Sequence, residues 1–297
     1  MQYSKSKRLL RRVLPRRGYR ALKALYWSPG ANGVRRLAGR LHAALLAPRL
    51  RNVRTLLLFI GYPRSGHSLV GSLLNAHRSI VVAHELHALW YLDRGFSAEE
   101  LFALIWRRDR WFGRHGRQWT EFNYTVPGQW QGRSDRLEII GDKKGDGVTD
   151  LLHFYPGALQ TALGRLGRRI RIIHTVRNPY DNVATMARRT GDPLSACIER
   201  HRNRVALNNE LIERYGEELI VTVRHEDLIA DAKGELRRMA AFLGVEVSEE
   251  YLEACRGIIY DSPNPSRHGA KWSEEDRRGV ERIIRRTPFL KGYEFEG

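Results

Sequence analysis

The chain has little cysteine and no long apolar run. Its two cysteines, Cys197 and Cys255, cannot form a disulfide framework in 297 residues, and they indicate a reducing compartment. No apolar stretch approaches the roughly 20 residues that span a bilayer, and the N-terminus lacks the uninterrupted apolar core of a secretion signal. We therefore expect a cytoplasmic protein without a transmembrane helix.

Acidic residues are missing from the first 54 positions. Fifteen of the 51 Lys and Arg residues lie there with no Asp or Glu, so this segment carries most of the formal net charge of +18. Leu9, Leu10, Val13 and Leu14 lie among arginines with partial helical periodicity. Two interpretations stay open: residues 1–50 bind an anionic membrane surface at its inner face, or they form a solvated basic extension.

Pro48 and the charged residues around it indicate a boundary near residue 52. We predict a basic, partly helical N-terminal extension over residues 1–52 and a single catalytic domain over residues 53–297, which is long enough to bury a core of its own.

Short apolar runs alternate with helical patterns along the rest of the chain. This alternation predicts an α/β fold of three layers with a central, mainly parallel sheet of about five strands flanked by helices. The phosphate-binding loop and the family resemblance described below imply the P-loop type of this fold. Ligands of such sheets bind beyond the carboxyl ends of the strands. The predicted strands are residues 56–60, 79–83, 137–141, 170–176 and 219–223, and the predicted helices are residues 68–76, 97–112, 149–164, 178–189, 193–215 and 233–243.

Residues 113–135 are rich in Gly, Trp and polar residues and predict a long irregular loop, which could cover a substrate cleft. Trp119, Tyr124 and Trp130 either anchor this loop or form a binding platform, and anchoring is the simpler interpretation.

The stretch GYPRSGHS, Gly61 to Ser68, follows the first predicted strand and precedes a predicted helix. It matches the phosphate-binding template G-x-x-x-x-G-K-[ST] at both glycines and at the serine, but His67 replaces the lysine. The lysine of that template supports the phosphates beside magnesium, so its replacement argues against an ATP-dependent kinase. The loop amides, the helix N-terminus and the guanidinium of Arg64 could still hold a phosphate.

A second basic motif, RNPYDNVAT, begins at Arg177 directly after the fourth predicted strand. Arg177 can reach an anion at the strand end, and Thr185 can offer a hydroxyl from two turns into the following helix. Together with the loop at Gly61–Ser68, this motif predicts a ligand with two separated anionic groups.

The two motifs carry a resemblance to a known family. YPRSGHS resembles the 5′-phosphosulfate loop of the sulfotransferases, and RNPYDNVAT resembles their 3′-phosphate motif, in the same order and about 110 residues apart. The resemblance extends over about residues 53 to 295. It implies an enzyme that uses 3′-phosphoadenylyl sulfate (PAPS) as co-substrate and needs no metal. The sulfuryl group would go to an acceptor hydroxyl on a carbohydrate, a glycolipid or another metabolite.

The resemblance also implies roles for particular residues. Arg177 and Thr185 would hold the 3′-phosphate, and Arg267 with His268 resembles a late basic segment that closes on it. His225 would lie near the adenine, although it replaces a tyrosine of the family pattern. The loop residues that would bind the 5′-phosphosulfate are Tyr62, Pro63, Arg64, Ser65, Gly66, His67 and Ser68.

An acceptor hydroxyl needs a base, because its own pKa is high. Glu85 resembles the glutamate that several sulfotransferases place after their second strand, and we expect it to be the base, with His84 and His87 as alternatives. Arg64 and Lys143 would stabilise charge on the leaving oxygen. The sequence His-Glu-Leu-His lacks the spacing of a HExxH zinc site, so no metal site is predicted.

Two other functions would each account for part of the sequence. A P-loop nucleotide or sugar kinase would use the same loop, with the aspartate Asp142 at the end of the third predicted strand as a magnesium ligand. A polyanion-binding protein would use the basic segment alone. The second alternative leaves both anion motifs unexplained, and we do not expect nucleic acid as a partner.

Overall fold

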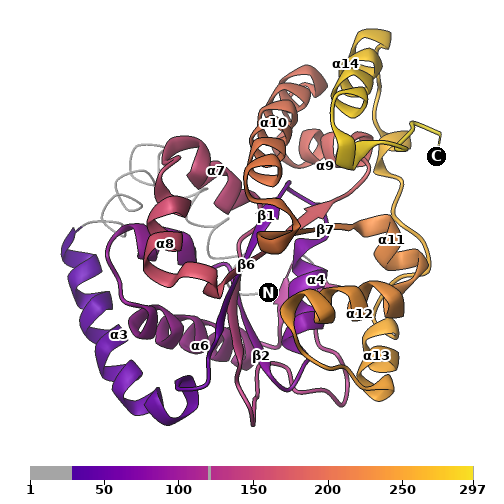
Figure 1. The fold of residues 1–297 in the computed structure, drawn as a ribbon. Helices are drawn as coiled ribbons and strands as arrows, with labels where there is room; N and C mark the ends of the chain where they lie inside the picture. The colour runs from indigo at the N-terminus through magenta and orange to yellow at the C-terminus, as the bar shows by residue number, and fades with distance from the viewer. Residues whose placement is uncertain (1–28, 120–121, 297) are drawn as a thin grey trace.

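The computed structural model describes residues 29–119 and 122–296. Figure 1 shows a central sheet with helices packed on both of its faces. The sheet has five parallel strands in the order β2-β5-β1-β6-β7. The predicted three-layer α/β fold is confirmed. The strands are β1 (Thr55–Gly61), β2 (Ile80–His84), β5 (Ile139–Lys143), β6 (Ile170–Val176) and β7 (Ile220–Arg224).

Helices connect the strands and form the two outer layers. The α-helices are α3 (Pro29–Leu50), α4 (His67–Asn75), α5 (Ala88–Asp93), α6 (Ala98–Arg114), α7 (Asp146–Phe154), α8 (Ala158–Leu166), α9 (Pro179–Thr190), α10 (Leu194–Leu219), α11 (His225–Ala230), α12 (Ala232–Leu243), α13 (Glu249–Arg256) and α14 (Glu274–Arg285). Short 3₁₀ turns follow at η1 (Gly167–Arg169), η2 (Ser266–Gly269) and η3 (Pro288–Leu290).

Strand β1 lies at the centre of the sheet, and all of its residues are buried. Successive side chains of a strand point to opposite faces. Leu56 and Leu58 therefore join the core that includes α5, α6 and α8, whereas Leu57 and Phe59 join the core that includes α4, α12 and α13. An uninterrupted apolar run is what a strand covered on both faces requires.

Several elements differ from the sequence prediction. Strand β5 begins and ends two residues later than predicted, at Ile139 and Lys143. The helical stretch over residues 149–164 is interrupted at Pro156 as predicted, since proline cannot donate a backbone hydrogen bond, but its first helix, α7, begins earlier, at Asp146. The predicted irregular loop contains a two-stranded antiparallel sheet of β3 (Gln118–Trp119) and β4 (Phe122–Asn123).

Helix α3 lies within the predicted N-terminal extension and packs against α6 (Figure 1). Glu100 joins the two helices: its Oε1 accepts a hydrogen bond from Arg40 Nε at 2.7 Å, and its Oε2 lies 3.7 Å from Arg36 Nε. The predicted helix around Leu9 to Leu14 lies outside the described residues. Among the residues that the structure describes, we find no helix with the length and apolar character needed to cross a bilayer.

Glu100 also completes the N-terminal cap of α6. Its backbone N–H donates to Ser97 Oγ at 3.2 Å, while Ser97 N donates to Glu100 Oε2 at 2.9 Å. One buried carboxylate thus caps α6 and pairs with two arginines of α3.

We expect Glu100→Ala to lower the free energy of unfolding by about 1–3 kcal/mol, because it removes the cap and leaves Arg36 and Arg40 without their partner. Chemical denaturation measures the change. Glu99→Ala, an exposed acidic residue of the same helical turn, is the control and should cost about 0.5 kcal/mol or less. Equal losses for the two variants would contradict the role given to Glu100.

Candidate functional site

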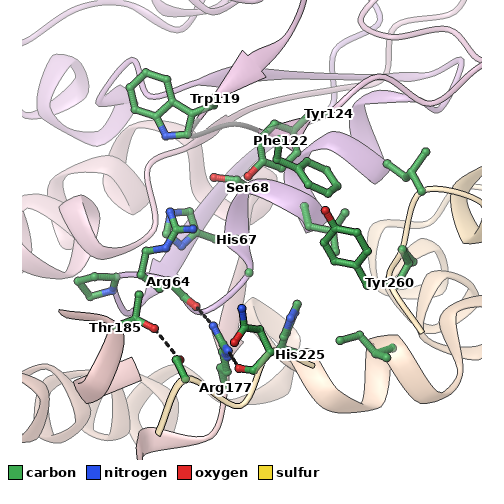
Figure 2. A pocket seen from close by; sticks show the side chains of 18 of the residues that line it. Arg64, His67, Ser68, Trp119, Phe122, Tyr124, Arg177, Thr185, His225 and Tyr260 are labelled. Atoms are coloured by element: carbon green, nitrogen blue, oxygen red, sulfur yellow. Dashed lines mark hydrogen bonds between the residues drawn. The ribbon is translucent and has the colours of Figure 1, made fainter. Parts of the chain in front are cut away.

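A cleft of about 510 Å³ opens at the carboxyl ends of the strands, a size typical of small-molecule sites. Figure 2 shows the phosphate-loop residues Arg64 and His67 on one side, with Arg177 and Thr185 nearby, and the ring of Trp119 across the cleft. The predicted site residues that line the cleft are Pro63, Arg64, Gly66, His67, Ser68, Glu85, Arg177, Thr185 and His225.

The loop between β1 and α4 turns at two glycines. Gly61 has φ +150°, and a Cβ there would lie 2.7 Å from the carbonyl oxygen of Thr175. Gly66 has φ +90°, and its Cβ would lie 2.6 Å from His225 Nδ1. Both positions therefore exclude a side chain, because a real Cβ is not found so close to another heavy atom.

Arg64 lies at the tip of the loop with φ +70°, a left-handed conformation that non-glycine residues seldom adopt. Helix α4 begins at His67, directly after the loop, and the first amides of a helix have no carbonyl partner within it. The loop thus combines a guanidinium with free amides and the positive end of a helix, which suits a phosphate.

Two predicted loop residues point away from the cleft. Tyr62 is fully buried, and its hydroxyl lies 3.1 Å from His174 Nε2. Ser65 is also buried: its Oγ donates to the Tyr62 carbonyl at 2.9 Å and lies 2.8 Å from Thr175 Oγ1. Both side chains hold the loop's shape from beneath, so any contact they make with a ligand must come from the backbone.

His67 replaces the lysine of the nucleotide template and is buried against Gly145. Burial, reinforced by the charge of Lys143, lowers the pKa of His67 to about 3. The imidazole is therefore neutral at physiological pH and cannot supply the positive charge that a kinase lysine would.

A cluster of charges surrounds Glu85. Its Oε1 lies 3.4 Å from Lys143 Nζ, and its Oε2 lies 3.2 Å from Lys144 Nζ. Lys143 Nζ also donates to Ser68 Oγ at 2.9 Å. Although burial opposes ionisation, the two ammonium groups hold the pKa of Glu85 well below its usual range. Lys143 itself is buried behind Ser68, and Lys144 was not singled out from the sequence.

Asp142 fixes the turn that carries Glu85. Its carboxylate is fully buried and accepts hydrogen bonds from the backbone N–H groups of Leu86 at 2.7 Å and Ala88 at 2.8 Å. Glu85 consequently keeps φ +57°. Asp142 therefore does not line the cleft, whereas a kinase would need this carboxylate in the cleft wall to bind magnesium.

Asp146, at the start of α7, is a cleft residue that sequence reasoning missed. Its Oδ1 lies 3.9 Å from His67 Nε2. Burial raises the pKa of this carboxyl group, although the nearby Lys144 opposes the shift. The only sequence signal was its position, directly after the Lys143-Lys144-Gly145 turn.

The second anion motif forms the far wall of the cleft. Arg177 Nη1 donates to the carbonyl oxygen of Arg64 at 3.4 Å, which joins the two motifs. Thr185 Oγ1 lies 2.7 Å from Ser266 Oγ (Figure 2). Arg188, one turn after Thr185, also lines the cleft. Its spacing of three residues on a helix could have identified it from the sequence.

The late basic segment is placed differently. Arg267 is buried and pairs with Asp181, with Nη1 2.7 Å from Oδ2, while its Nε donates to the carbonyl oxygen of Phe295. His268 is exposed and lies 5.7 Å from the Phe295 ring, centroid to centroid. Neither side chain lines the cleft, whereas their neighbours Asn264 and Ser266 do.

The two histidines proposed as alternative bases also lie outside the cleft wall. His84 is buried and stacks on Phe112 with ring centroids 4.3 Å apart. Burial and the charge of Lys143 hold its pKa well below the usual range. His87 is the residue before α5 and has φ +73°.

Two buried polar atoms test whether the cleft suits an anionic nucleotide. Arg177 Nε and His225 Nδ1 have no hydrogen-bond partner among the described residues, and both residues line the cleft. Buried polar groups in native proteins are normally paired. A basic and a heteroaromatic side chain at one cavity suit a ligand that carries phosphate and a heteroaromatic base, although both Nη atoms of Arg177 already donate to carbonyl oxygens and His225 Nδ1 faces Gly66. Within those same residues, no group of three or more His, Cys, Asp or Glu side chains could hold a metal ion.

Comparison with known proteins agrees with this geometry. The model of the sulfotransferase family matches residues 157–249, slightly less than a third of the chain. The match contains Arg177, Thr185 and His225, but not the loop at Gly61–Ser68. A search of curated protein sequences finds no match.

Two solved sulfotransferase domains share the α/β fold of this chain. The sulfotransferase domain of the Synechococcus PCC 7002 olefin synthase aligns with a TM-score of 0.51 and 17% identity, over 78% of this chain and 94% of that domain. The sulfotransferase domain of the curacin biosynthetic pathway aligns with a TM-score of 0.51 and 14% identity, over 79% and 98%. The family-model match agrees with the predicted resemblance to sulfotransferases over residues 157–249, and the two solved domains show that the chain shares their fold.

If the cleft takes adenosine 3′,5′-diphosphate (PAP), as proposed in the next subsection, Gly66→Ala should weaken its binding by about tenfold or more, because the added Cβ collides with His225 and strains the loop. Isothermal titration calorimetry measures the affinity. Gly191→Ala is the matched control: Gly191 has φ +77° but no atom within 4 Å of its Cβ position. It carries the same backbone strain outside the cleft and should leave affinity unchanged. Equal affinity in both variants would contradict the conclusion that position 66 has no room for a side chain when the ligand binds.

Proposed function

We propose that the protein transfers a sulfuryl group from PAPS to an acceptor hydroxyl. The observation that carries this proposal is the joining of two anion sites in one cleft, where Arg177 bonds the carbonyl oxygen of Arg64 at 3.4 Å. One site suits a 5′-phosphosulfate and the other a 3′-phosphate. A nucleoside triphosphate has no 3′-phosphate to occupy the second site.

In this proposal the chain holds the donor at three places. Arg64 and the amides of Gly66, His67 and Ser68 would take the 5′-phosphosulfate. Arg177, Thr185 and the newly identified Arg188 would take the 3′-phosphate. His225 would lie beside the adenine, which its place in the cleft wall supports. PAPS supplies the activated sulfuryl group, and the protein supplies position and charge.

The reaction forms a bond between the acceptor oxygen and sulfur and breaks the bond from sulfur to the bridging oxygen. The electron pair of the broken bond stays on the leaving diphosphate, and Arg64 and the loop amides stabilise that charge. The acceptor proton goes to a carboxylate, which we assign to Glu85.

Lys143 connects these two events. Its ammonium contacts both Ser68 Oγ and Glu85, at 2.9 and 3.4 Å. An anion bound in the loop would compete with Glu85 for this ammonium. If the ammonium of Lys143 moved partly toward the bound anion, Glu85 would lose part of its ion pair. The pKa of Glu85 would then rise, which makes the carboxylate a better base.

Aromatic side chains support an acceptor that presents a ring or an apolar face. Trp119, Phe122, Tyr124 and Tyr260 line the cleft near Ser68 (Figure 2), and such rings stack on flat or apolar surfaces. A carbohydrate or glycolipid hydroxyl fits this surface.

The kinase alternative is less well supported. It requires a cation where the neutral His67 lies, and it requires Asp142 to bind magnesium although both carboxylate oxygens already accept backbone hydrogen bonds. Turnover of ATP with magnesium, without use of PAPS, would favour it instead.

Arg64→Ala should lower the rate of sulfuryl transfer by about 100-fold or more, because a preorganised donor to the leaving oxygen is lost. Arg64→Lys should restore part of this rate. Radiolabelled PAPS is incubated with the protein and with fractionated cell extract, and label in the acceptor fraction is counted. Arg278→Ala, an exposed arginine of α14, is the control. Full activity of Arg64→Ala would refute the assignment.

Glu85→Gln should lower transfer by about 100-fold or more while PAP affinity changes little, because the base acts on the acceptor and not on the donor. Asp146→Asn and His84→Ala are measured beside it. If Glu85→Gln keeps near-normal transfer while one of the other variants loses it, the base is that other residue. Calorimetry with PAP shows that the donor site of each variant is intact.

A further inference from the structure

Helix α3 carries an apolar stripe that faces solvent. The exposed fractions of Val34, Leu37, Leu41 and Leu45 are 71%, 61%, 60% and 79%. These positions recur every three or four residues, so they lie on one face of the helix. Among residues 29–119 and 122–296, half of the eight exposed large apolar side chains belong to this one face.

The opposite face of α3 is the one that packs on the domain. Gly39 lies against the backbone of Glu100, where a Cβ would be 3.3 Å from the carbonyl oxygen. Leu46 packs on the core, and Leu50 is buried in it. The stripe is therefore not the core-facing side of a displaced helix.

Two more exposed apolar residues lie near the first turns of α3. Phe154 and Tyr155, at the end of α7, are exposed by 73% and 46%. Arg94 connects them to α3: its carbonyl oxygen accepts a hydrogen bond from Arg36 Nη2 at 3.0 Å, and its guanidinium lies 5.3 Å from the centroid of the Tyr155 ring. Figure 1 shows α3 and α8 along the same side of the molecule.

The charged side chains of α3 itself are all basic. Arg35, Arg40 and Arg49 belong to this helix, which contains no Asp or Glu, and Arg40 pairs with Glu100 of α6. In the sequence, the preceding residues 1–28 contain nine Lys or Arg and no acidic residue. A helix with an apolar face flanked by arginines is the pattern of segments that lie in the interface of an anionic bilayer.

We propose that the stripe of α3, formed by Val34, Leu37, Leu41 and Leu45, docks on the surface of an anionic lipid bilayer. The apolar side chains enter the boundary between headgroups and acyl chains, and the surrounding arginines contact lipid phosphates. The inference is independent of the proposed function, because it uses no residue of the cleft.

A second copy of this chain is the main other occupant of such a face, and charge argues against it. Two copies of α3 would bring together arginine-rich surfaces with no carboxylate on either helix, and like charges repel at close range. A lipid surface with anionic headgroups complements this charge.

The test is co-sedimentation of the full-length protein with vesicles of phosphatidylcholine containing 30% phosphatidylglycerol, compared with vesicles of phosphatidylcholine alone. We expect binding to the anionic vesicles and about tenfold weaker binding after the triple change Leu37→Gln, Leu41→Gln and Leu45→Gln. Glutamine has nearly the helix propensity of leucine, so α3 should persist.

The matched control replaces the same three leucines with methionine, which keeps the face apolar and should retain binding. Unchanged binding by the glutamine variant, or equal binding to neutral and anionic vesicles, overturns the proposal. So does a wild-type dimer in sedimentation equilibrium that the glutamine variant loses, because the face then belongs to a second copy. PAP affinity is measured separately on the same variants. A protein that does not bind PAP would contradict only the proposed function and not the membrane proposal.

Discussion

The geometry of the candidate site depends on one buried carboxylate, that of Asp142. It accepts hydrogen bonds from the amides of Leu86 and Ala88 and so clamps the turn after β2 to the end of β5. Glu85 projects from that turn toward Lys143 and Lys144. Without Asp142, two amides would lose their acceptor, which is costly where water cannot replace it. The charged cluster beside the phosphate loop exists because this clamp holds its backbone.

The sequence predicted the strands best where burial is complete. Strand β1 contains the predicted residues 56–60 because a strand covered on both faces has an unbroken apolar run. Strand β5 was predicted to end at Gly141 but continues through Asp142 and Lys143. These polar residues are buried only because distant groups satisfy them, and no local pattern reveals that. The strands β3 and β4 have two residues each, too few to show alternation.

Spacing identified the loop but not the direction of its side chains. Glycines at 61 and 66 predict the turn, whereas the inward orientation of Tyr62 and Ser65 depends on His174 and Thr175 of β6, more than a hundred residues later. The same limit applies to Arg267, whose partner Asp181 belongs to α9. Arg188, in contrast, follows Thr185 by one helical turn and was accessible to sequence reasoning. Residue roles carried over by motif therefore need the tertiary partners before they can be assigned to a side chain.

The ammonium of Lys143 lies between two acceptors, Ser68 Oγ and the carboxylate of Glu85. In the proposed reaction this shared cation makes the strength of the base depend on what the loop holds. With the loop empty, the two lysines balance the charge of Glu85, and the ionised carboxylate is a weak base toward a hydroxyl. With an anion in the loop, the cation is divided and the carboxylate becomes more basic. The consequence is that removal of the acceptor proton waits for the donor, whichever of the two substrates binds first.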